Sequence, residues 1–320
     1  MAAQSTTTHA AVLGVRRTTW RRLLLALFFI SPWIAHFLML NIYPMAASFY
    51  YSLTTYSVLK EPVFIGVQNY TDLIVEDPRF KTALYNTVYY TVGAVFVGTV
   101  AAIAMAILLN MRVKGLSVYR TIFYLPSVTP AVAASIVWLW FLNPQYGVLT
   151  TIIRAAGEIT NLLFGFRIPV IGWLSDPVWA KPALILMAWW GVGGQIVIYL
   201  AGLQGVPQEL YEAAQIDGAN GWQQFRHVTL PMLSPVILFN VITGMIGSFQ
   251  YFTQIYILTG GGPADATLMY AYYLYQTAFE FFKMGYASAM AWILFLIVLA
   301  CTLLIFRTSA RWVYYGGESR

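Results

Sequence analysis

A polar stretch at 212–231, EAAQIDGANGWQQFRHVTLP, gathers the groups of this sequence that could do chemistry or bind a partner. It contains Glu212, Asp217, Arg226 and His227, and Glu209 lies just ahead of it. Long uncharged apolar runs flank it on both sides. A hydrophobic chain that keeps such a segment needs it either for catalysis or for contact with another molecule.

Recognisable catalytic motifs are missing from the rest of the sequence. It has no HExxH, no GxSxG and no carboxylate pair in the apolar runs, which argues against an intramembrane hydrolase. It also has no GxxxxGK[ST] phosphate-binding loop, so any ATP hydrolysis requires a separate polypeptide. We expect His36 to be a packing residue because no proton-relay partner is evident, and the single cysteine, Cys301, to be a small apolar packing residue.

Composition indicates an integral membrane protein. Hydrophobic residues make up 59% of the chain and charged residues only 9%, against about 25% charged in an average soluble domain. Six apolar segments are long enough to cross a hydrocarbon core of about 30 Å as helices. The sequence therefore predicts an all-α fold with six transmembrane helices, at about 23–53, 84–109, 121–142, 182–203, 234–258 and 284–306.

Basic residues predict the orientation of these spans. The short loop at 110–120 contains Arg112, Lys114 and Arg120 and no acid, which is typical of a cytoplasmic loop. Both termini and the 204–233 segment are then cytoplasmic. We expect a disordered cytoplasmic tail at 1–20, a six-helix membrane domain at 21–310 and a cytoplasmic tail at 311–320. Short helices are expected to cover the outer face.

The polar stretch itself reads as helix, turn, helix. Pro207 suits a helix start, with Glu209 and Glu212 in the first turns where the helix dipole favours acids. Gly218 is predicted to end that helix. A second short helix is expected from Trp222 to about Val228, ending before Pro231.

The spacing in this segment resembles a known family. It reads Glu212-Ala213-Ala214, three residues, Gly218, nine residues, then Val228-Thr229-Leu230-Pro231. The segment is similar to the cytoplasmic EAA loop of permease subunits in bacterial binding-protein-dependent ABC importers, with Val in place of Ile. GVQNYTDL at 66–73 and YILTGGGP at 256–263 resemble the sugar-importer branch, specifically maltose F-type and glycerol-phosphate A-type permeases. So do 124–149 and 189–207, which extends the resemblance over most of the chain.

The resemblance implies a type I importer permease in the bacterial inner membrane. Its partners would be a second homologous permease, a dimer of ABC ATPase subunits that bind ATP and Mg, an extracytoplasmic solute-binding protein and the lipid bilayer. The chain would bind no cofactor or metal itself. Net charge is +6, but no basic, aromatic-interleaved patch suggests nucleic acid. Residues implied in ATPase coupling are Glu212, Ala213, Ala214, Asp217, Gly218, Arg226, Leu230 and Pro231.

A sugar path should offer aromatic faces and amides without fixed charge. If SFQYFTQIY at 248–256 is helical, its aromatic side chains form one stripe and Gln250 lies beside it. The fourth span adds aromatic residues, glycines and an amide. By resemblance to the maltose F-type subunit and by side-chain chemistry, the candidates for the substrate path are Trp189, Gly191, Gly194, Gln195, Phe249, Gln250 and Phe252.

Three alternatives stay open. The importer could carry glycerol phosphate or another solute, although the spans lack basic groups for an anion. The chain could be a self-sufficient channel or secondary carrier, although carriers usually keep intramembrane charges. Packing of helix against helix explains any single aromatic residue about as well as a role in the path.

Overall fold

A computed structural model describes residues 17–111, 114–166 and 169–314. The expected tail at 1–20 lies mostly outside the described residues, as does most of the C-terminal tail at 311–320. Within the described residues four helical stretches are long and apolar enough to cross a membrane, and two bent helix pairs bring the total to six. The predicted helical membrane fold is thereby confirmed, apart from one small β-hairpin, and six spans result if each bent pair is one span. The β-hairpin lies at the end of the molecule that the sequence predicts to face outward, which we call the outer end or outer face.

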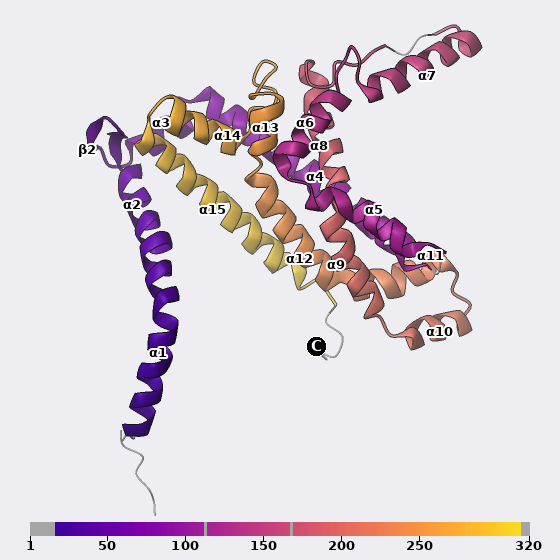
Figure 1. Cartoon of the computed structure of the whole chain (residues 1–320), viewed down its shortest axis with the longest axis horizontal. Coiled ribbons are helices and arrows are strands. Elements are labelled where there is room, and N and C mark those ends of the chain that lie inside the picture. Colours follow the sequence, from indigo (N-terminus) through magenta and orange to yellow (C-terminus); the bar gives the residue numbers. More distant parts are fainter. Residues whose placement is uncertain (1–16, 112–113, 167–168, 315–320) are drawn as a thin grey trace, which may run out of the picture.

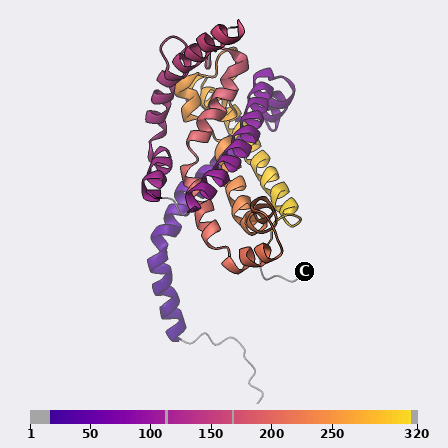
Figure 2. The ribbon, with the colours of Figure 1, turned by 90° about the vertical axis from the view of Figure 1, so that its right-hand side faces the viewer.

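The first span is a continuous helical rod that leaves the bundle (Figure 1 and Figure 2). It comprises α1 (Arg17–Phe37), the π-helical turn η1 (Leu38–Ile42) and α2 (Tyr43–Ser52). The wide turn directly precedes Pro44, whose ring and missing N–H do not fit a regular α-helical turn. The helix therefore continues through this turn, and Trp20–Ser52 forms one candidate span. From Trp20 onward nearly every side chain of α1 is exposed, His36 among them, so this histidine does not pack inside the chain.

Helix α4 (Pro78–Asn110) is the central helix of the bundle and packs against α8 (Pro177–Trp190), α9 (Gly193–Gln204) and α12 (Leu230–Phe249). Its contact face is built from small residues four apart in the sequence: Ala94, Gly98, Ala102 and Ala106, all buried. Small residues let helix backbones approach closely. Such packing drives the association of helices in a membrane, because apolar lipid tails leave no hydrophobic driving force between them.

The third and fourth spans are bent pairs. α5 (Leu116–Val128) meets α6 (Ala131–Phe141) at 102°, and α8 meets α9 at 49°. Pro130 explains the first bend because a residue before proline, here Thr129, avoids the helical region. The unbroken helix predicted at 121–142 is therefore wrong in shape.

The fifth span differs from the prediction at both ends. α11 (Gly221–Gln224), the π-helical turn η2 (Phe225–Thr229) and α12 form one helical stretch, so the second helix of the polar segment does not end before Pro231. At the outer end α12 stops at Phe249, and α13 (Thr253–Leu258) follows after three non-helical residues. The continuous aromatic stripe predicted for 248–256 does not form. The sixth span, α15 (Met284–Ser309), is regular.

The outer face carries short elements, as expected, together with an antiparallel hairpin that the sequence analysis did not predict. β1 (Thr54–Ser57) pairs with β2 (Lys60–Phe64), with Thr54 opposite Phe64 and Ser57 opposite Lys60. The short helices are α3 (Gln68–Val75), α7 (Val148–Phe164), α14 (Tyr270–Tyr275) and the π-helical turn η3 (Gln276–Glu280). Helix α10 (Gln208–Ile216) lies at the opposite end of the molecule (Figure 1).

Candidate functional site

The polar segment folds into a helical hairpin, α10–turn–α11 (Pro207–Pro231). We call it the cytoplasmic hairpin after the location that the sequence predicts for it. Gly218 ends α10 in the left-handed conformation, with φ of 76°. The N–H of Ala219 donates to the carbonyl of Ala214 at 2.9 Å, and the N–H of Gly218 donates to that of Gln215 at 3.0 Å. This pair of hydrogen bonds is the glycine-terminated C-cap expected at a helix end.

The second arm of the hairpin begins with a reciprocal cap. The N–H of Gln223 donates to the side chain of Asn220 at 3.0 Å, and the N–H of Asn220 donates to the side chain of Gln223 at 2.8 Å. Tyr211 on α10 lies 3.0 Å, oxygen to oxygen, from the hydroxyl of Thr229. Because α11 runs through η2 into α12 without a break, the second arm of the hairpin and the fifth span form one helical stretch.

Most predicted coupling residues lie on the surface of this hairpin. The exposed ones are Glu212, Ala213, Asp217, Gly218, Arg226 and Leu230, whereas Ala214 and Pro231 are half-buried. Two further residues stand out: Ile216 is 86% exposed and Trp222 is 68% exposed, on either side of the turn. The sequence analysis did not single out Ile216 as a candidate contact residue, although two large apolar side chains beside a turn glycine were a usable signal.

The first group of substrate-path candidates surrounds the break between α8 and α9. Trp189 and Gly191 are exposed, and a side chain at Gly194 would meet open space. Gln195 instead enters the bundle. Its amide lies near Gly98 of α4 and Gly244 of α12, and its side-chain oxygen is buried without a hydrogen-bond partner. A buried unpaired amide is costly, which suits a group that must accept a hydrogen bond from something else.

The second group surrounds the break between α12 and α13. Gln250 is exposed at the end of α12, and Phe252 is half-buried against aromatic residues of α13 and α14. Helix breaks of this kind free backbone carbonyls for polar ligands, and within a membrane they occur where the backbone is buried or lines a cavity. The structure therefore brings the candidates to two helix breaks and not to a single stripe.

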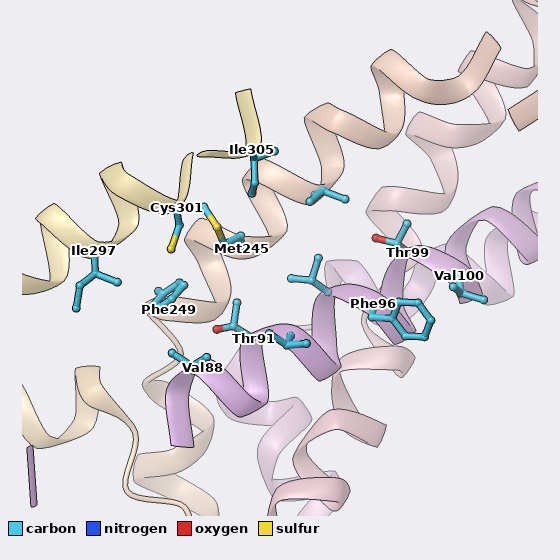
Figure 3. A pocket seen from close by; sticks show the side chains of 13 residues that line it. Val88, Thr91, Phe96, Thr99, Val100, Met245, Phe249, Ile297, Cys301 and Ile305 are labelled. Carbon is cyan, nitrogen blue, oxygen red and sulfur yellow. The ribbon is translucent and has the colours of Figure 1, made fainter. Parts of the chain in front are cut away.

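Phe249 belongs to a different environment. It lines an apolar cavity of about 520 Å³ between α4, α12 and α15, together with Met245 and Cys301 (Figure 3). The hydroxyls of Thr91 and Thr99 are the polar side-chain groups in this lining, and the remaining side chains are aliphatic, aromatic or sulfur-containing. Such a cavity fits an apolar occupant better than a sugar, and Cys301 acts there as the small apolar residue expected from the sequence.

The outer end is fastened by a polar network that sequence reasoning did not find. Asp77 caps α4 by accepting from the N–H of Phe80, and it also accepts from the hydroxyls of Tyr273 at 2.7 Å and Tyr286 at 2.9 Å. Burial, and secondarily the hydrogen bond to Asp77, raise the pKa of Tyr273 above its ordinary value.

A second set of contacts joins α4 to the loop before α14. Arg79 forms an ion pair with Asp265 at 3.2 Å. The amide of Asn86 donates to the carbonyls of Asp265 at 2.8 Å and Leu268 at 3.2 Å, and Lys181 donates to Asn86 at 2.9 Å. These partners lie 95 to 186 positions apart in the chain, so no local pattern reveals them. Among the described residues no group of three or more His, Cys, Asp or Glu could hold a metal ion.

Comparison with known proteins decides the family. Residues 94–313, more than half of the chain, match the family described as binding-protein-dependent transport system inner membrane component. The chain belongs to this family. It is therefore a non-catalytic, multi-pass permease component of the bacterial inner membrane, and its transport system depends on a binding protein.

Relatives match over nearly their whole length. A probable ABC transporter permease protein of Bacillus subtilis, YesP, is 40% identical over 91% of this chain and 92% of its own. The lactose transport system permease protein LacF of Rhizobium radiobacter is 36% identical, covering 87% and 91%. The arabinooligosaccharides transport system permease protein AraP of Bacillus subtilis is 31% identical, covering 95% and 96%.

A solved structure shares the fold. A chain of a bacterial alginate ABC transporter, solved in complex with a pentasaccharide-bound periplasmic protein, superimposes with a TM-score of 0.77. It is 22% identical, and the match covers 92% of this chain and 96% of that one.

Proposed function

We propose that this chain forms half of the translocation pathway for a saccharide in an ATP-driven importer. A second homologous permease supplies the other half, a dimer of ATPase subunits binds ATP and Mg, and an extracytoplasmic solute-binding protein delivers the cargo. Both termini and the cytoplasmic hairpin face the ATPase.

The cytoplasmic hairpin carries this proposal. It presents Glu212 and Gly218 at the spacing of the EAA loop, on an exposed surface that continues as one helix into the fifth span. A carrier or channel that works alone has no need of an exposed lever of this kind.

The saccharide cargo rests on the relatives and on the chemistry of the path. Lactose and arabinooligosaccharides are named for two relatives. Within its spans, the charged residues of this chain lie near the ends and not in the middle, which favours a neutral cargo. One further relative is a sulfoquinovosyl glycerol permease, so an anionic saccharide is the second candidate.

The test is ATP hydrolysis by the assembled complex in proteoliposomes, with the chain, its partner permease, the ATPase and the binding protein all present. A panel of neutral and anionic saccharides is compared with glycerol phosphate. We expect binding protein loaded with a neutral saccharide to raise the rate. Stimulation by glycerol phosphate alone, or solute flux through the chain without an ATPase, would contradict the proposal.

A further inference from the structure

A cluster of aromatic rings lies at the outer end of the fifth span, where α13, α14 and η3 meet. Phe252 and Tyr256 of α12–α13 contact Tyr275 of α14, with ring centroids 5.0 and 5.7 Å from that of Tyr275. Tyr275 in turn lies 5.3 Å from Phe279. Tyr272 completes the cluster, with its ring centroid 6.2 Å from that of Tyr256.

These rings are not part of the buried core. The core of the outer half includes Tyr272 and the half-buried Phe252, but not Tyr256, Tyr275 or Phe279. Tyr256 is 52% exposed and Phe279 is 57% exposed. Two rings of the cluster, Tyr256 and Phe279, are therefore open and available to a ligand, while Phe252, Tyr272 and Tyr275 hold them from behind.

Polar groups border the rings. The side-chain amide of Gln276 donates to the hydroxyl of Tyr272 at 3.3 Å and to Glu280 at 3.1 Å. The side-chain oxygen of Gln276 is buried and has no hydrogen-bond partner. Gln250, exposed at the end of α12, precedes Phe252 by two residues. Open ring faces with hydroxyl, amide and carboxylate groups at their edge match a sugar, which has apolar C–H faces and a rim of hydroxyls.

We propose that this aromatic cluster is a saccharide subsite at the outer end of the path, where a sugar ring stacks on Tyr256 and Phe279. The inference rests on the proposed saccharide cargo, and it extends the second helix break, where Phe252 lies, to the aromatic residues of α13, α14 and η3. Glu280 at the edge makes the subsite suited to neutral rings. A subsite displaced outward along the path contacts the far units of an oligosaccharide more than it contacts a monosaccharide.

The test is uptake by the complete complex in proteoliposomes, using labelled mono- to tetrasaccharides of the class that wild type transports. The variants are Tyr256→Ala, Phe279→Ala and Tyr256→Phe. Phe164→Ala is the control, because Phe164 is an equally open aromatic residue on α7, outside the cluster.

We expect Tyr256→Ala and Phe279→Ala to raise the KM for tri- and tetrasaccharides by about three- to tenfold, the range of one aromatic contact. The KM for the monosaccharide should change less, and Tyr256→Phe and Phe164→Ala should behave like wild type. Equal effects at every chain length, or no effect, would overturn the subsite and assign these rings to the membrane interface. Loss of the partner permease from the purified variants would overturn it in favour of a subunit contact. If wild type transports no saccharide at all, it is the proposed function that fails.

Discussion

The cytoplasmic hairpin and the outer face of this permease are built in opposite ways. In the hairpin, the hydrogen bonds of Ala219, Asn220 and Gln223 join residues three to five positions apart. On the outer face, the tertiary partners of Asp77 and Asn86 lie 95 to 209 positions away. The shape of the hairpin thus depends on hydrogen bonds between residues close in the sequence, and its surface is exposed to a partner. The outer face depends on long-range tertiary contacts, which hold the ends of α4, α14 and α15 together.

This difference predicts how each region responds to mutation. Changes in the hairpin should impair communication with the ATPase and leave the fold of the membrane domain intact. Changes in the outer network should lower the stability of the domain itself.

The largest effect is expected at Gly218. No atom lies within 4 Å of the position a Cβ would take, so the constraint is the φ of 76° alone. Gly218→Val should distort the turn, because a left-handed residue costs about 1–2 kcal/mol for ordinary side chains and more for a β-branched one. We expect at least a tenfold loss of binding-protein-stimulated ATP hydrolysis. Gly218→Asn should retain most of it, since Asn tolerates this conformation; equal rates for the two variants would contradict the argument.

A charge reversal at Glu212 should come next. Glu212→Lys presents a cation where the family resemblance implies contact with the ATPase, and we expect severalfold weaker co-purification of the ATPase with an unchanged thermal unfolding midpoint. Glu209→Lys, on the first turn of the same helix, is the matched control for charge. If both charge reversals lower the co-purification of the ATPase equally, the cause is the change in net charge and not the loss of Glu212.

Asp77 tests the other half of the comparison. Asp77→Ala removes a helix cap and the acceptor for two tyrosine hydroxyls. We expect a loss of about 2–4 kcal/mol in the free energy of unfolding, measured in detergent. Glu76→Ala changes the exposed neighbouring acid and should be nearly neutral. An Asp77→Ala variant as stable as wild type would show that the outer network contributes nothing to stability.

The same contrast between local and long-range contacts separates the features that the sequence predicted from those that it did not. The apolar spans, the Pro207 start and the Gly218 turn were predictable, because each depends on the composition or the pattern of neighbouring residues. The break at Gln250 was not predictable, since an apolar run has the same composition whether the helix continues or bends. The sheet pairing of Thr54 with Phe64 was not predicted either. The burial of Gln195 between Gly98 and Gly244 depends on three helices at once.

Gln195 gives a smaller, functional prediction. Its side-chain oxygen has no partner, so Gln195→Leu should not destabilise the fold. If the amide contacts cargo, saccharide uptake should fall severalfold at the same time. Paired measurements of uptake and of the unfolding midpoint check this, with Gln204→Leu at the exposed end of α9 as the control. A clear drop in the midpoint with normal uptake would make Gln195 a packing residue.

Alkaline pH should produce the smallest effect. The pKa of Tyr273 is raised in the folded protein, so its contribution is complete below about pH 10, the unfolded value, and declines as the pH rises further. Tyr273→Phe should flatten the fall in stability above pH 10. An identical fall in wild type and variant would remove Tyr273 from the explanation.

The most direct test of the account is ATP hydrolysis by the reconstituted complex, measured with sugar-loaded and with empty binding protein, for wild type, Gly218→Val and Gly218→Asn. The account predicts strong stimulation by loaded binding protein in wild type and Gly218→Asn, and none in Gly218→Val. Full stimulation of Gly218→Val would contradict the claim that the cytoplasmic hairpin transmits the ATPase's motion to the fifth span.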